Sequence, residues 1–104
     1  MKLEKDEEDD FVQRAAVEYG CLSYKFKIDG ISGIPDRIVI CPGGRILFLE
    51  FKRGNNQPSD QQKRIQREWR KKGHIVEFVW SADEAMNLLR KVLMRWGILN
   101  EHME

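Results

Sequence analysis

The feature that most constrains this chain is an apolar segment, residues 46–49, that runs directly into Glu50 and Lys52. A segment that is apolar on both faces is typical of a strand in the middle of a covered sheet. Side chains two positions apart in a strand share a face, so Glu50 and Lys52 point to the side that Ile46 and Phe48 occupy. Burying an ionised group is costly unless it is paired, hydrogen-bonded or bound to a metal. The two charges therefore predict a functional site at the end of a buried strand.

A second strand is expected just before this one. Residues 37–41 are apolar and β-branched, and Pro42-Gly43-Gly44 turns the chain back, so residues 45–52 should pair with them as an antiparallel hairpin. A turn centred on these glycines brings Asp36 opposite Glu50 or a neighbour of Glu50. The sequence thus predicts two carboxylates close enough to share one cation.

Periodicity and cap signals predict the remaining elements. They are a helix over residues 4–19, a strand over 22–28, a helix over 60–72 after a Ser59–Gln62 capping box, a strand over 74–80, and a helix that starts after Ser81 and ends at Gly97. The expected order is α, β, β, β, α, β, α within one domain, residues 1–104. The fold class is therefore α/β, with a mixed four-stranded sheet flanked by helices.

The inner faces of the helices follow from the same periodicity. They comprise Phe11, Val12, Ala15, Ala16 and Tyr19 in the first helix, Ile65 and Trp69 in the second, and Met86, Leu89, Leu93 and Trp96 in the third. One turn back along the first face lies Glu8, the one acid of the N-terminal cluster that we expect to point inward.

Charge is distributed unevenly along a chain whose formal net charge is only +1. Eight bases and two acids fall between Lys52 and Lys72. Such a basic surface suggests a polyanionic partner, although a solvated helix face would have the same composition. No apolar run reaches the about 20 residues that span a bilayer, and the acidic N-terminus lacks a signal-peptide centre, so a cytoplasmic protein without a membrane partner is expected. Cys21 and Cys41 are expected to be reduced core residues.

The carboxylate pair and the lysine have the chemistry that metal-assisted phosphodiester hydrolysis needs. Asp36 and Glu50 would hold Mg²⁺ or Mn²⁺ through oxygen ligands, and the backbone carbonyl of Phe51 could add another. Lys52 would orient the attacking water or stabilise developing negative charge. The simpler alternative, a surface ion pair between Glu50 and Lys52, would suit an amphipathic edge strand, which this segment is not.

The combined motifs resemble a known family. Gly-Ile-Pro-Asp-Arg at positions 33–37, Phe-Leu-Glu-Phe-Lys at 48–52, Ser59 with Gln62, and a basic helix ending at Gly73 are similar to the VRR-NUC family of the PD-(D/E)xK nuclease superfamily. The resemblance implies a restriction-endonuclease-like fold and a divalent-metal-dependent DNA endonuclease in replication or repair. It maps Asp36, Glu50 and Lys52 onto the catalytic set, together with Gln62 and an acid of the first helix. Glu8 is the match for that acid, and Asp9 fits almost as well.

Small stand-alone members of the family are similar to phage-encoded proteins, which would work in the cytoplasm of the host cell. The resemblance further implies a homodimer acting on branched DNA such as a Holliday junction, with Ile98, Leu99 and the last helix as candidate interface. Ile98 and Leu99 lie beyond the last helix and could dock either on their own domain or on a second copy. The bases expected to contact phosphate are Lys25, Arg37, Arg53, Lys63, Arg64 and Arg67.

Three questions stay open at the level of the sequence. Gln62 could serve only the capping box, or act near the metal as well. The domain could bind nucleic acid without cleaving it. Cleavage of RNA or of unbranched DNA ends would need the same residues, because phosphate and metal contacts carry no information about sugar or branching.

Overall fold

The computed structural model of the protein describes residues 4–100, and the order of its elements is the predicted one. The elements are α1 (Glu4–Tyr19), β1 (Leu22–Lys25), β2 (Arg37–Cys41), a 3₁₀ turn η1 (Pro42–Gly44), β3 (Arg45–Phe51), α2 (Asp60–Lys71), β4 (Val76–Val79) and α3 (Ala82–Arg95). The predicted bounds of the first helix are confirmed. The strands predicted over 22–28 and 74–80 are too long at one end or both, because the chain beyond Lys25 leaves the sheet and residues 74–75 still belong to the loop after α2.

The four strands form one mixed sheet in the order β1-β2-β3-β4. Strands β2 and β3 are the predicted antiparallel hairpin, and its tight turn uses Gly43 and Gly44 at positive φ values of 79° and 73°. Arg37 pairs with Leu49, so the next position along the register sets Asp36 opposite Glu50. Strand β4 runs parallel to β3 after the crossover through α2. The α/β fold class is confirmed.

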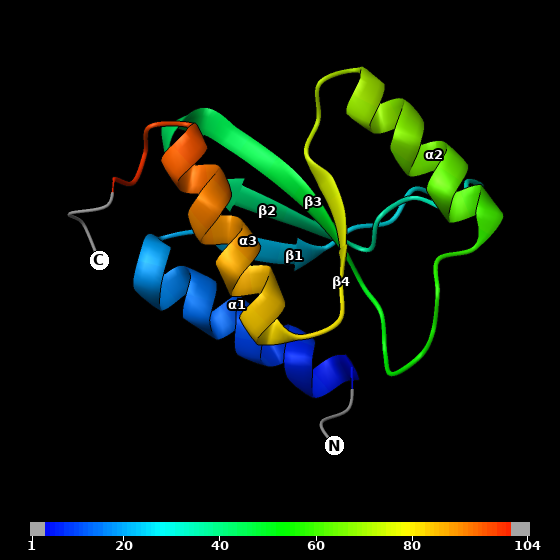
Figure 1. The fold of residues 1–104 in the computed structure, drawn as a ribbon, viewed down its shortest axis with the longest axis horizontal. Helices are drawn as coiled ribbons and strands as arrows, with labels where there is room; N and C mark the ends of the chain where they lie inside the picture. The colour runs from blue at the N-terminus through cyan, green and yellow to red at the C-terminus, as the bar shows by residue number, and fades with distance from the viewer. Residues whose placement is uncertain (1–3, 101–104) are drawn as a thin grey trace.

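Helices α1 and α3 lie side by side over one face of the sheet (Figure 1). The core forms between them and the sheet, and its largest members are Phe11, Leu47, Leu49, Phe51, Leu89 and Leu93. Helix α2 covers only part of the opposite face, where the ring of Trp69 packs against that of Phe48 at 5.0 Å between centroids. One face of the sheet is therefore fully covered and the other only near β3 and β4.

Two residues that the sequence placed on inner faces are exposed. Ile46 does not lie in a buried stripe: it is 38% exposed, because α2 does not extend over its end of β3. Ala16 is also exposed, on the outer side of α1. Cys21 and Cys41 are buried free thiols in the core, as expected.

The segment after α3 folds back onto its own domain. The backbone N–H groups of Ile98 and Leu99 donate to the carbonyl of Leu93, and Leu99 is 7% exposed within the core cluster. Leu99 therefore docks on its own domain, one of the two positions that the sequence allowed, and its buried side chain is not available to the candidate dimer interface.

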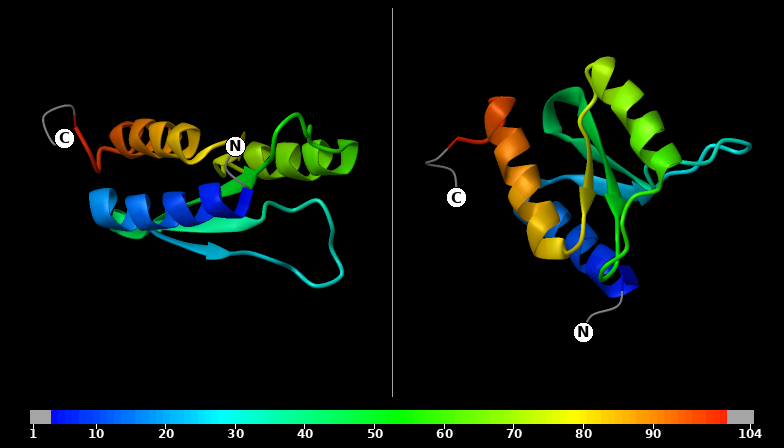
Figure 2. Two further views of the ribbon diagram at one scale, coloured as in Figure 1. Left: turned by 90° about the horizontal axis from the view of Figure 1, so that it is seen from below. Right: turned by 45° about the vertical axis from the view of Figure 1, so that its right-hand side comes forward.

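Residues 27–34, between β1 and β2, project from the body of the fold as an arm (Figure 2). The base of the arm is closed by a 2.8 Å hydrogen bond from the Phe26 N–H to the Asp36 carbonyl. The part of the arm that leads back to Asp36 contacts α2, because Gln61 Nε2 donates to the Ser32 hydroxyl at 2.9 Å and to the Ser32 carbonyl at 3.2 Å. The arm thus links the chain that leads to Asp36 with the first turn of α2. Among residues 4–100, no helix has the length and apolar content needed to cross a bilayer.

Candidate active site

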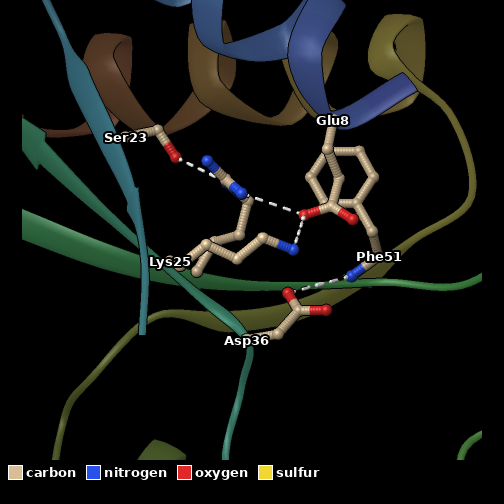
Figure 3. Close-up of polar contacts among 6 residues, drawn as sticks. Glu8, Ser23, Lys25, Asp36 and Phe51 are labelled. Carbon is tan, nitrogen blue, oxygen red and sulfur yellow. Dashed lines mark hydrogen bonds and ion pairs between the residues drawn. The ribbon is translucent and has the colours of Figure 1, made fainter. Parts of the chain in front are cut away.

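Asp36 and Glu50 meet where β2 begins and β3 ends. The Phe51 backbone N–H donates to Asp36 Oδ1 at 3.4 Å (Figure 3), and Glu50 is only 7% exposed. Burial and the nearby negative charge of Glu8 raise the pKa of Asp36 to about 6, against the opposing effects of the Phe51 N–H, the Glu50 side chain and Lys25. The predicted carboxylate pair is therefore present, in surroundings that disfavour an additional negative charge.

Lys52 lies beside this pair and is held by α2. Its Nζ donates a 2.7 Å hydrogen bond to Gln62 Oε1, which also accepts from the Ser59 backbone N–H at 2.9 Å. The Ser59 hydroxyl in turn accepts from the Gln62 N–H at 3.1 Å, which completes the predicted capping box. One amide oxygen of Gln62 therefore caps α2 and also fixes the ammonium group of Lys52, whereas the role of Gln62 near the metal stays a prediction.

Glu8 points inward from α1, as predicted, whereas Asp9 is exposed. Glu8 Oε1 accepts from Arg37 Nη1 at 2.9 Å and from Lys25 Nζ at 3.4 Å, and Arg37 Nε donates to the Ser23 hydroxyl at 3.0 Å (Figure 3). Glu8 is thus held at the edge of the site by two bases.

The assignment of Arg37 to phosphate binding requires correction. Its side chain is buried and its guanidinium is committed to Glu8 and Ser23, so it does not form part of the nucleic-acid-accessible surface. The charge of Glu8 explains this burial, because a buried guanidinium needs a carboxylate partner. The other predicted phosphate contacts are exposed: Lys25, Arg53, Lys63, Arg64 and Arg67.

The donor set suits a hard divalent cation. Asp36 and Glu50 offer carboxylate oxygens from adjacent strands, and backbone carbonyls and water commonly complete such sites. Within residues 4–100, no three side chains of the His, Cys, Asp or Glu type are gathered as a ready-made cation site. A cation bound here would therefore rely on the two carboxylates together with backbone or water ligands.

Three residues near the site escaped the sequence analysis. Ser23 and Gln61 are polar side chains whose partners, Arg37 and Ser32, lie far away in sequence. Gln66 is the only fully buried residue of α2, although the predicted inner face of that helix was Ile65 and Trp69. Its place four positions after Gln62 was an available signal, since such residues share a helix face.

No family model matches the chain, but comparison with known proteins finds similar proteins. The protein named "Putative nuclease p44" of Acyrthosiphon pisum secondary endosymbiont phage 1 is 38% identical over 64 residues, which are 62% of this chain and 69% of that protein. A solved structure described as "VRR_NUC domain" superposes with a TM-score of 0.74 at 33% identity, covering 83% of this chain and 92% of the other. Both similarities agree with the nuclease family that the motifs around Asp36 and Glu50 predict.

Proposed function

This chain belongs to the VRR-NUC family of nucleases, and we propose that it is a divalent-metal-dependent DNA endonuclease selective for branched DNA. The observation that carries the proposal is the position of Asp36 opposite Glu50, with Lys52 held beside them by Gln62. Two neighbouring carboxylates, of which Glu50 is buried and Asp36 half-buried, and an oriented ammonium group are the components that hydrolysis of a phosphodiester by water requires. None of them needs to act as a nucleophile.

Each residue has a part in the proposed mechanism. Asp36 and Glu50 would hold Mg²⁺ or Mn²⁺, which supplies Lewis acidity toward the scissile phosphate and lowers the pKa of a bound water. Lys52 would stabilise the negative charge that develops on the phosphate oxygens, and Gln62, which accepts a hydrogen bond from the ammonium group, would orient it. Glu8, which forms an ion pair with Arg37, would add negative charge at the edge of the cation site.

The test uses purified protein, a four-way junction, and a linear duplex of the same sequence, with Mg²⁺ or Mn²⁺. We expect cleavage that EDTA abolishes and that favours the junction. Asp36→Ala and Lys52→Ala should each lose the activity, whereas Glu68→Gln, an acid on the exposed side of α2, should keep it. Cleavage that survives Asp36→Ala or Lys52→Ala would refute the site.

The exposed bases supply the proposed DNA surface. Lys63, Arg64 and Arg67 follow Gln62 along α2, and Arg53 follows Lys52, so these positive charges begin at the site itself. Contacts of this kind give affinity that falls steeply with salt. They also support the second candidate function, a non-cleaving DNA-binding module, which salt-sensitive binding without cleavage under either metal would favour.

We also propose that two copies act together, because a four-way junction presents equivalent strands to be cut. The part of the sheet face that α2 leaves uncovered carries an exposed apolar row, where Leu22, Ile40 and Ile46 lie side by side on three strands and are 49%, 41% and 38% exposed. This row lacks the charge that a DNA contact needs, which favours a second copy as its occupant. Sedimentation equilibrium should give a dimer, and Ile40→Asp should give a monomer.

A further inference from the structure

Gln66 carries a fully buried side-chain amide on α2. Its side chain is 0% exposed, and neither Oε1 nor Nε2 has a partner among residues 4–100. Buried polar side chains in folded proteins almost always have a partner, and an exception calls for an explanation. Leucine at this position would fill nearly the same space without an unsatisfied group, so packing alone does not account for a glutamine.

The neighbours of Gln66 on α2 fix its place over the sheet. Gln62, four positions earlier, hydrogen-bonds Lys52, and Trp69, three positions later, packs on Phe48. This face of α2 therefore runs antiparallel to β3, from Lys52 at one end to Phe48 at the other. The middle of that β3 segment is Glu50, and the middle of the helix face is Gln66.

The dimensions of the two elements agree with this alignment. Seven helical residues rise about 10 Å, and four strand residues rise about 13 Å. Arg70, the next residue on the same face of α2, lies against β4, since its Nε donates to the Val76 carbonyl at 2.8 Å. Gln66 is thus one helical turn closer than Arg70 to the end of α2 that contacts Lys52. On β3, Glu50 pairs in register with Phe78 of β4, two residues after Val76.

We propose that Gln66 is a positioning residue of the cation site, with its amide available to the Glu50 carboxylate and to water bound with the cation. The inference rests on the proposed function, because it assigns Glu50 to a divalent cation. An amide offers two donors and an acceptor, which suits a site where a carboxylate and ordered water must be oriented together. In the cation-free protein the unsatisfied amide lowers the free energy of unfolding, and binding of the cation with its water would offset this loss by giving the amide a partner.

A glutamine that positions the cation site should affect thermal stability and Mn²⁺ affinity in opposite directions, which a purely structural glutamine would not do. Gln66→Leu should raise the unfolding temperature of the protein in EDTA by several degrees, because an unsatisfied buried amide is removed. The same variant should bind Mn²⁺ about ten-fold or more weakly, as expected for loss of an outer-shell partner. Gln66→Met, which keeps an unbranched side chain, is the second variant in case leucine packs badly.

The measurements are differential scanning fluorimetry in EDTA and titration calorimetry with Mn²⁺ on the full chain. Trp69→Phe is the control, since it alters the same helix–sheet contact one turn away and should leave the Mn²⁺ affinity within about two-fold of the wild type. A Gln66→Leu or Gln66→Met protein that binds Mn²⁺ as tightly as the wild type overturns this inference alone. A wild type that neither binds Mn²⁺ nor cleaves DNA overturns the proposed function and this inference together.

Discussion

Arg37 Nη1 donates a 2.9 Å hydrogen bond to Glu8 Oε1, and both side chains are less than one-tenth exposed. This contact joins the first helix to the strand that follows Asp36. It brings an acid of the N-terminal cluster to the edge of the carboxylate pair, where its charge contributes to the raised pKa of Asp36. Arg37 therefore supports the site through Glu8, and its contribution should be visible in the stability of the protein.

Removal of Arg37 should destabilise the protein strongly. Arg37→Met leaves the Glu8 carboxylate buried without its closest base, and loss of one partner of a buried ion pair costs about 3–5 kcal/mol. Urea unfolding at neutral pH measures the change. Lys25→Met is the matched control, because Lys25 contacts the same oxygen from a side chain that is 77% exposed, and its loss should cost less than about 1 kcal/mol. Glu8→Gln in the Arg37→Met background should restore part of the stability.

Asp36 should make stability depend on pH in a direction opposite to that of an ordinary paired carboxylate. Its pKa is raised from 3.8 to about 6 in the folded state, so the folded protein holds this proton more tightly than the unfolded chain does. The stabilisation is present at low pH and is lost as pH rises through the folded pKa. Asp36→Asn, whose amide stays neutral, should therefore gain about 2 kcal/mol over the wild type between pH 4 and pH 8.

Urea unfolding of both proteins across this pH range gives the comparison, and an advantage of Asp36→Asn that is the same at every pH would contradict it. Mn²⁺ should raise the unfolding temperature of the wild type at pH 8 and not that of Asp36→Asn, because the cation binds the ionised carboxylate. The wild-type rise should shrink as the pH falls below about 6, where Asp36 holds its proton.

These residues show which parts of the fold and of the site could be predicted from the sequence. The approach of Asp36 to Glu50 or a neighbour of Glu50 followed from a short turn between two β-branched strands, and the Ser59–Gln62 cap from a local pattern, whereas the exact register came from the structure. The burial of Arg37 was not predictable, because its partners Glu8 and Ser23 come from two other elements. Gln66 was missed for a related reason: periodicity arguments count apolar residues, and a buried amide departs from that rule.

The double role of Gln62 can be separated by mutation. Ser59→Ala removes one side of the capping box and should cost about 1 kcal/mol in stability while leaving Lys52 in place, so cleavage measured well below the unfolding temperature should persist. Gln62→Ala removes the cap and the 2.7 Å contact to Lys52, and should lower cleavage at least about ten-fold in addition. Equal cleavage by the two variants would show that Gln62 acts only as a cap.

The link between the arm and α2 should be measurable at Gly33. This residue has a φ of +91°, and a Cβ there would lie 3.0 Å from Gln61 Cγ and 3.2 Å from the Gln61 carbonyl oxygen. Gly33→Ala should cost about 1 kcal/mol from the positive φ and a further amount from pushing the arm away from α2. Gly30→Ala isolates the first cost, since Gly30 has a φ of +82° and open space around it.

The arm leads directly into Pro35 and Asp36. We therefore expect Gly33→Ala, which loses more unfolding free energy than Gly30→Ala, also to bind Mn²⁺ more weakly, and Gly30→Ala to bind it as the wild type does. Urea unfolding and Mn²⁺ titration of the two variants provide both quantities. Equal Mn²⁺ affinities would mean that the position of Asp36 is set by its hydrogen bonds with Phe26 and Phe51, and that the Gln61–Ser32 contact serves only to restrain the arm.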